Sequence, residues 1–140
     1  TYSRPTKDKT AEFFEVCKSL ADYVFLDCTS SLDDPLSVYG MAAADKAVQL
    51  VTPDIRSAAY YASFEKTYEQ IKSKSIGVIN ITDKDLYLPV GEVKAGFANA
   101  KYRLPYSMYL KQQYITGELT HKIPDQKFSA VCRGIAGAVL

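Results

Sequence analysis

Lys46-Ala-Val-Gln-Leu-Val51 runs directly into Thr52-Pro53-Asp54, and this junction decides the fold class. The first six residues are mostly apolar, as in a strand that is buried on both faces. The next three predict a helix start, because Thr52 supplies a capping hydroxyl, Pro53 suits the first helical position and Asp54 suits the first turn. A strand that leads straight into a helix is typical of α/β proteins with a parallel sheet.

The same alternation continues on both sides of this junction. Further strands are predicted at residues 23–27, 76–81 and 102–105. Helical patterns cover residues 7–20, 36–44, 55–71, 90–97, 108–114 and 128–139. We therefore expect residues 1–140 to form one α/β domain in three layers, a mainly parallel sheet flanked by helices. The strand residues expected to be buried between those helices are Val24, Phe25, Val48, Leu50, Val78 and Ile79.

Composition limits the class of protein. The 140 residues are 47% hydrophobic and 24% charged, with a net charge of +1, which indicates a globular domain with a real core. No apolar run reaches the roughly 18 residues of a membrane-spanning helix, and residues 1–9 lack the apolar segment of a secretory signal. The near-zero charge gives no direct signal for nucleic acid or a membrane surface. Three widely spaced cysteines argue against disulfides and zinc, so we expect a cytoplasmic protein.

The polar residues at strand ends are the candidate site, because parallel strands present their carboxyl ends at one edge of the sheet. Asp27, Asn80 and Pro105 each stand at such an end, so we expect them along the same edge. Asp27 could hold Mg²⁺ through a water beside a phosphate, or it could only cap a turn. Asp33 and Asp34 are interpreted as a solvated loop rather than as metal ligands.

Asn80 and Tyr106 each have two interpretations. The amide of Asn80 offers both a donor and an acceptor, which suits the edge of a purine base. Alternatively, that amide bonds to a neighbouring backbone group. Tyr106 could flank a bound ring or simply cover the end of the sheet.

Four stretches together resemble the C-terminal half of the MinD/ParA group of P-loop ATPases. They are Ala21-Asp-Tyr-Val-Phe-Leu-Asp27-Cys-Thr, Ala44-Asp-Lys-Ala-Val-Gln-Leu-Val-Thr-Pro-Asp54, Ile76-Gly-Val-Ile-Asn80 and Tyr102-Arg-Leu-Pro105-Tyr. Their order and spacing, with the closing amphipathic helix, match over nearly the whole chain. The resemblance implies that Asp27 is the Walker B aspartate and that residues 28–34 are switch II. It also implies that Asn80 reads adenine, with Pro105 and Tyr106 packed beside the base.

The resemblance further implies ATP and Mg²⁺ as cofactors of the intact protein, and a homodimer as its working form. Its protein partner would belong to a system that positions plasmids, division proteins, flagella or pili. Two features depart from the family. Thr29-Ser-Ser-Leu replaces the usual Pro-Pro or Pro-Ala-Gly, and no G-x-x-x-x-G-K-[ST] phosphate loop occurs. We therefore expect a portion of a larger protein or a degenerate relative, and no ATP turnover by this chain alone.

Two other functions stay open at this point. The first is a non-enzymatic protein-interaction domain that keeps a degenerate ATPase fold and binds no nucleotide. The second is a receiver domain, because Asp27 follows a predicted strand and Thr52 ends the next one. Asn80-Ile-Thr stands where receivers have a Lys-Pro pair, which disfavours the second alternative.

Overall fold

The computed structural model describes residues 6–29, 33–84, 88–97, 99–118 and 122–140. The chain forms two compact units, Thr1–Asp45 and Lys46–Leu140, which we call unit 1 and unit 2. Among the residues described, no helix combines the length and the apolar character needed to cross a membrane.

Unit 1 contains the helices α1 (Lys7–Leu20) and α2 (Pro35–Ala43). The start of α2 is stabilised by Asp34, whose carboxylate accepts a hydrogen bond of 2.9 Å from the backbone N–H of Ser37. This is the usual role of an aspartate at a helix N-cap. Asp34 is therefore a structural residue of the loop that the sequence analysis interpreted as merely solvated.

The two helices of unit 1 pack closely at Gly40 of α2. A Cβ atom at this position would lie 3.4 Å from Cζ of Phe14 and 3.0 Å from Cδ1 of Leu26. Phe14 is 6% exposed and Thr10, on the same helix, is 1% exposed. The missing side chain of Gly40 thus lets α1 and the segment after it approach α2.

The strand predicted at residues 23–27 is not formed, so this prediction was wrong. Residues 21–29 contain neither helix nor strand, and Val24 and Phe25 are 40% and 81% exposed. A strand depends on hydrogen bonds to a neighbouring strand, and the described part of unit 1 contains no strand to supply them. The apolar character of this run therefore does not by itself produce β structure.

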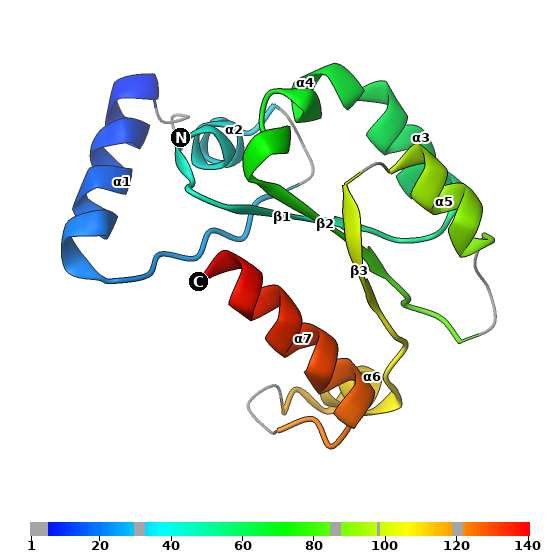
Figure 1. Cartoon of the computed structure of the whole chain (residues 1–140). Coiled ribbons are helices and arrows are strands. Elements are labelled where there is room, and N and C mark those ends of the chain that lie inside the picture. Colours follow the sequence, from blue (N-terminus) through cyan, green and yellow to red (C-terminus); the bar gives the residue numbers. More distant parts are fainter. Residues whose placement is uncertain (1–5, 30–32, 85–87, 98, 119–121) are drawn as a thin grey trace. The chain divides into compact units, whose positions relative to one another are not determined.

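Unit 2 contains a three-stranded parallel sheet in the order β1-β2-β3. Its elements are, in chain order, β1 (Ala47–Val51), α3 (Ile55–Ser63), α4 (Glu65–Glu69), the 3-10 helix η1 (Lys72–Lys74), β2 (Ser75–Asn80), α5 (Val90–Gly96), β3 (Ala100–Leu104), α6 (Met108–Thr116) and α7 (Gln126–Val139). Helices α3 and α5 lie on one face of the sheet and α7 lies on the other (Figure 1). The expected α/β class, with a parallel sheet flanked by helices, is confirmed.

The core of unit 2 lies between the sheet and the helices α3 and α5. Ile79 at the centre of this face is 1% exposed, and Val51 of β1 and Phe97 beyond α5 are 5% and 1% exposed. Tyr61 of α3 packs edge-on against Phe97, with 4.7 Å between the ring centroids. This packing holds the carboxyl halves of β1 and β2 in place.

The opposite face of the sheet is covered unevenly, which corrects two predictions of burial. Val78 is fully buried as expected, but Val48 and Leu50 of β1 are 43% and 62% exposed. On this face α7 packs against β3, where the hydroxyl of Tyr102 donates a 3.0 Å hydrogen bond to the carbonyl oxygen of Gly134. Since β1 is the outer strand on the far side of β2, its side chains remain partly in water.

Candidate functional site

The three strands of unit 2 end at one edge of the sheet, which we call the carboxyl edge. The register pairs Val51 with Ile79 and Asn80 with Leu104. The segments that begin at Thr52, at residue 81 and at Pro105 therefore leave the sheet side by side. Open α/β sheets bind their ligands at this edge. Asn80, Pro105 and Tyr106 all belong to it.

Asn80 is the last residue of β2 and is half-buried. Just beyond it, the backbone N–H of Ile81 donates a 3.0 Å hydrogen bond to the carbonyl oxygen of Leu104, which fixes the end of the strand. Within the described part of the chain, the Asn80 amide makes no hydrogen bond to another residue. Its donors and its acceptor are therefore free to meet a ligand.

The end of β1 forms a polar cluster that serves helix α3. Asp54, and not Thr52 as predicted, is the N-cap, because its carboxylate accepts a 2.9 Å hydrogen bond from the backbone N–H of Ser57. The hydroxyl of Thr52 also donates to this carboxylate, and Oγ of Ser57 accepts from the backbone N–H of Thr52 at 3.2 Å. These hydrogen bonds lower the pKa of the Asp54 carboxyl below its ordinary value.

Sequence reasoning located this helix start within two residues but assigned the cap to the wrong side chain. The signal that identifies the cap is an aspartate followed three residues later by Ser57, since an N-cap carboxylate accepts from the N–H three residues on. The partners of Thr52 and Asp54 in this cluster are all within the chain. The capping of α3 therefore explains the polar residues at the end of β1 without a ligand.

The end of β3 leads into α6 through Pro105, Tyr106 and Ser107. Tyr106 packs against the core of unit 2, and its hydroxyl lies 3.6 Å from Sδ of Met108. This packing agrees with the alternative in which Tyr106 covers the end of the sheet. Ser107 is the N-cap of α6 and is 5% exposed, yet its hydroxyl has no hydrogen-bond partner among the described residues. Sequence reasoning gave Ser107 no role, because nothing in the sequence indicates its burial.

Asp27 belongs to unit 1, where it is exposed and follows no strand. A Walker B aspartate or a receiver aspartate requires the end of a strand, so neither setting is formed here. Beside it, burial raises the pKa of the Cys28 thiol, a hydrogen bond with Ser37 opposes that rise, and the charges of Asp27 and Asp34 add to it. Ser30 and Ser31, which belong to the stretch Thr29-Ser-Ser-Leu that departs from the family pattern, lie outside the described residues.

The predicted Mg²⁺ ligand was also Asp27. Over the described ranges of the chain, no group of three or more His, Cys, Asp or Glu side chains is placed to hold a metal ion. Mg²⁺ is usually held by one or two carboxylates together with waters and substrate phosphates. The role of Asp27 as a Mg²⁺ ligand therefore stays a prediction, and we derive no step through the metal.

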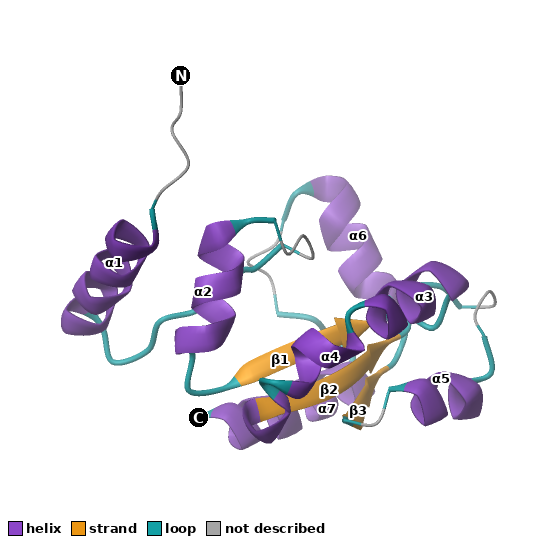
Figure 2. Ribbon diagram, turned by 90° about the horizontal axis from the view of Figure 1, so that it is seen from above, coloured by secondary structure: helices purple, strands orange, loops and turns teal. Residues whose placement is uncertain are grey.

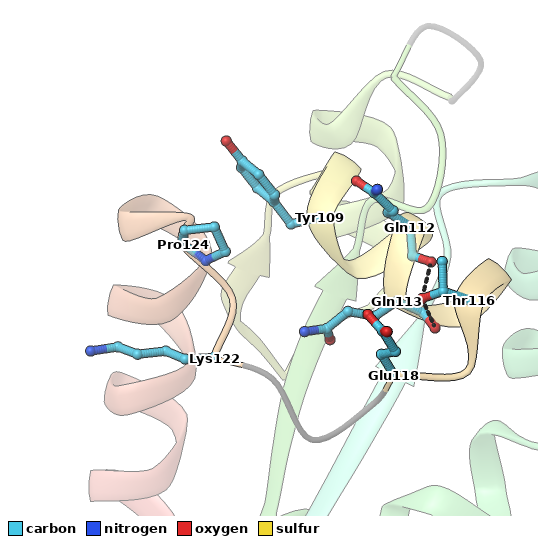
Figure 3. Close-up of a pocket in the computed structure, with 7 residues that line it drawn as sticks. All are labelled: Tyr109, Gln112, Gln113, Thr116, Glu118, Lys122 and Pro124. Atoms are coloured by element: carbon cyan, nitrogen blue, oxygen red, sulfur yellow. Dashed lines mark hydrogen bonds between the residues drawn. The ribbon is translucent and has the colours of Figure 1, made fainter.

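A hollow of about 160 Å³ lies beside α6 (Figure 3), and none of the predicted site residues lines it. It is lined by Tyr109, Gln112, Gln113, Thr116, Glu118, Lys122 and Pro124. The hydroxyl of Thr116 lies 3.1 Å from the carbonyl oxygen of Gln112, so it is used within the helix. Pockets for small molecules usually measure about 300–1,000 Å³. This hollow is too small for a nucleotide.

The carboxyl edge thus presents the amide of Asn80, which has no hydrogen-bond partner in the described part of the chain, between the capped start of α3 and the segment that begins at Pro105. Tyr106 supplies aromatic surface on the same edge. The chain has no significant match to a protein-family model, to a curated protein or to a solved structure.

Proposed function

We propose that the carboxyl edge of unit 2 binds the base of an adenine nucleotide. The observation that carries this proposal is the Asn80 amide, which stands at the end of the central strand without a partner in the described chain. An amide complements adenine because its oxygen accepts from the exocyclic amino group while its N–H donates to a ring nitrogen. Pro105 and Tyr106, at the end of the adjacent strand, supply apolar surface beside the base.

Base contacts alone make this binding weak. Phosphoryl transfer needs backbone N–H groups and a lysine around the phosphates, and the sequence contains no glycine-rich loop that supplies them. The chain by itself therefore does not hydrolyse ATP in this proposal.

The wider proposal follows the resemblance to the MinD/ParA group. In it, the chain is the base-binding and dimerisation part of a cytoplasmic ATPase with a P-loop NTPase fold. The intact protein works as a homodimer with ATP, and it positions plasmid, division, flagellar or pilus machinery through a protein partner. The support within this chain is the parallel sheet and the position of Asn80 on it.

The test is calorimetric titration of the chain with ATP and GTP. We expect the wild-type chain to prefer ATP, and Asn80→Ala to weaken ATP binding by about tenfold, the loss of one or two good hydrogen bonds. Asn80→Asp should shift the preference toward GTP, because a carboxylate accepts from both N–H donors of guanine. Gln112→Ala removes an exposed amide on α6 and is the matched control. An unchanged ATP affinity in Asn80→Ala would exclude the proposed role.

A second candidate function is a protein-interaction domain that binds no nucleotide. The observation in its favour is the exposure of large apolar side chains, with Phe25 81%, Leu50 62%, Ile55 71% and Tyr114 82% exposed. Exposed apolar surface marks binding sites for other proteins. A wild-type chain that is folded by circular dichroism but binds neither nucleotide would favour this function.

A further inference from the structure

We propose that the carboxyl edge of this chain takes an uncharged adenine nucleoside, and that the carboxylate of Asp54 excludes the phosphorylated forms. This inference rests on the proposed function, because it assumes an adenine base at Asn80. In the sheet, β2 lies between β1 and β3 (Figure 2). A ligand centred on Asn80 therefore has the end of β1 on one side and the end of β3 on the other.

The two sides of Asn80 differ in their chemistry. On the side of β3, Pro105 and Tyr106 are half-buried, and Tyr106 packs against the core of unit 2. On the side of β1, Thr52 and Asp54 present a hydroxyl group and a carboxylate. A base stacks on aromatic and apolar surface, whereas ribose carries hydroxyl groups that need polar partners. The base therefore lies toward β3 and the ribose toward β1.

The register of the sheet brings Asp54 close to Asn80. Val51 pairs with Ile79, so the next residues along the two chains, Thr52 and Asn80, stand side by side. Neighbouring strands lie about 4.8 Å apart. The Thr52 hydroxyl donates a hydrogen bond to the carboxylate of Asp54. Asp54 is therefore one hydrogen bond away from the residue beside Asn80, which is within the length of a nucleoside.

The Asp54 carboxylate can accept hydrogen bonds from ribose in addition to those that cap α3. Asp54 is exposed. One of its oxygens accepts from the Thr52 hydroxyl, and the other accepts from the backbone N–H of Ser57 at 2.9 Å. Each carboxylate oxygen has two lone pairs, so each can accept one further hydrogen bond. A ribose hydroxyl is a donor and can supply that bond, whereas an ionised phosphate offers only acceptors and a like charge.

The start of α3 is not available to a phosphate. In α/β proteins a phosphate commonly sits at a helix N-terminus, where backbone N–H groups and the helix dipole attract it. Here the N–H of Ser57 donates to Asp54, and the N–H of Thr52 donates to Oγ of Ser57 at 3.2 Å. The positive charge of Arg56 stabilises the ionised form of Asp54. The chain's own carboxylate therefore occupies the position that a phosphate would take.

The first test is calorimetric titration of the wild-type chain with adenosine, AMP and ATP, without Mg²⁺ and at constant ionic strength. We expect adenosine to bind most tightly and ATP at least about threefold more weakly, because repulsion between charges at a surface is modest and is screened by salt. 2′,3′-Dideoxyadenosine, which lacks both ribose hydroxyl groups, should bind about tenfold more weakly than adenosine, the loss expected for a hydrogen bond to a charged group.

The second test compares two aspartate N-caps of unit 2. Asp54→Asn keeps a capping side chain but removes the charge, so it should raise the affinity for ATP relative to adenosine at least about threefold. Asp125→Asn is the matched control. Asp125 caps α7, where its carboxylate accepts a 3.0 Å hydrogen bond from the N–H of Phe128, and α7 lies on the opposite face of the sheet from α3. This variant should keep the wild-type ratio of the two affinities.

The outcomes separate this inference from the proposed function. A wild-type chain that binds ATP more tightly than adenosine, with both affinities reduced by Asn80→Ala, would overturn the inference and leave the proposed function standing. A folded chain that binds neither ligand would overturn both. A ratio that Asp54→Asn leaves unchanged would remove the role of Asp54. The ligand series on the wild-type chain needs no variant, so it decides the preference even where Asp54→Asn destabilises α3.

Discussion

Residues 23–26 of unit 1 and residues 76–79 of unit 2 are both short, mostly apolar runs that end at a polar side chain, yet only the second is a strand. Phe25 in the first run is 81% exposed, whereas Ile79 in the second is 1% exposed. The second run has a hydrogen-bonded neighbour on each side, β1 and β3. The first has none within the described part of its unit. Whether an apolar run forms a strand therefore depends on its hydrogen-bonded neighbouring strands as much as on its own sequence.

The sharpest test of this contrast is Ile79→Ala. We expect it to lower the free energy of unfolding of unit 2 by about 3 kcal/mol, because it opens a cavity in a core that does not collapse easily. Urea denaturation followed by far-ultraviolet circular dichroism measures the change. A loss below about 1 kcal/mol would mean that β2 is not the buried centre of its unit.

The sequence predicted what depends on local pattern. It located β2, the start of α3 to within two residues, and the common edge of Asn80 and Pro105, because apolar runs, capping residues and the direction of parallel strands are visible in it. It could not show that Val48 and Leu50 are exposed, since both outer and inner strands are apolar here. Burial of the Ser107 hydroxyl has no local signal either.

Helix caps provide an intermediate case, because they depend on local chemistry in both units. Asp34→Ala in unit 1 and Asp54→Ala in unit 2 should each cost about 1 kcal/mol of stability.

The contribution of Asp54 to stability should depend on pH, because the fold lowers the pKa of its carboxyl. This contribution is present above the unfolded pKa of about 3.9 and is lost as the pH falls through the lower folded value. Chemical denaturation at several pH values measures how the free energy of unfolding depends on pH. Asp54→Asn should keep the N-cap hydrogen bond and abolish the part of this pH dependence that comes from Asp54. An unchanged pH dependence would contradict the assignment of Asp54 as the ionised N-cap of α3.

The smallest effect is expected from Phe25→Ala in the run that is not a strand. With 81% of its surface in water, Phe25 should contribute less than about 0.5 kcal/mol to stability. The same denaturation experiment, run beside Ile79→Ala, measures it. A loss comparable to that of Ile79→Ala would show that residues 23–26 are buried in solution, and the contrast between the two runs would disappear.

The all-parallel ladder of unit 2 has a consequence for how the chain is made. No two of its strands are joined by a hairpin, because α3, α4 and η1 separate β1 from β2, and α5 separates β2 from β3. Pairings between segments so distant in the chain form slowly, because each closes a long loop before it gains any contact. During translation, the apolar central strand leaves the ribosome before β3 exists to flank it. Chaperones that shield nascent apolar segments therefore have the longest opportunity to act between the synthesis of Asn80 and that of Leu104.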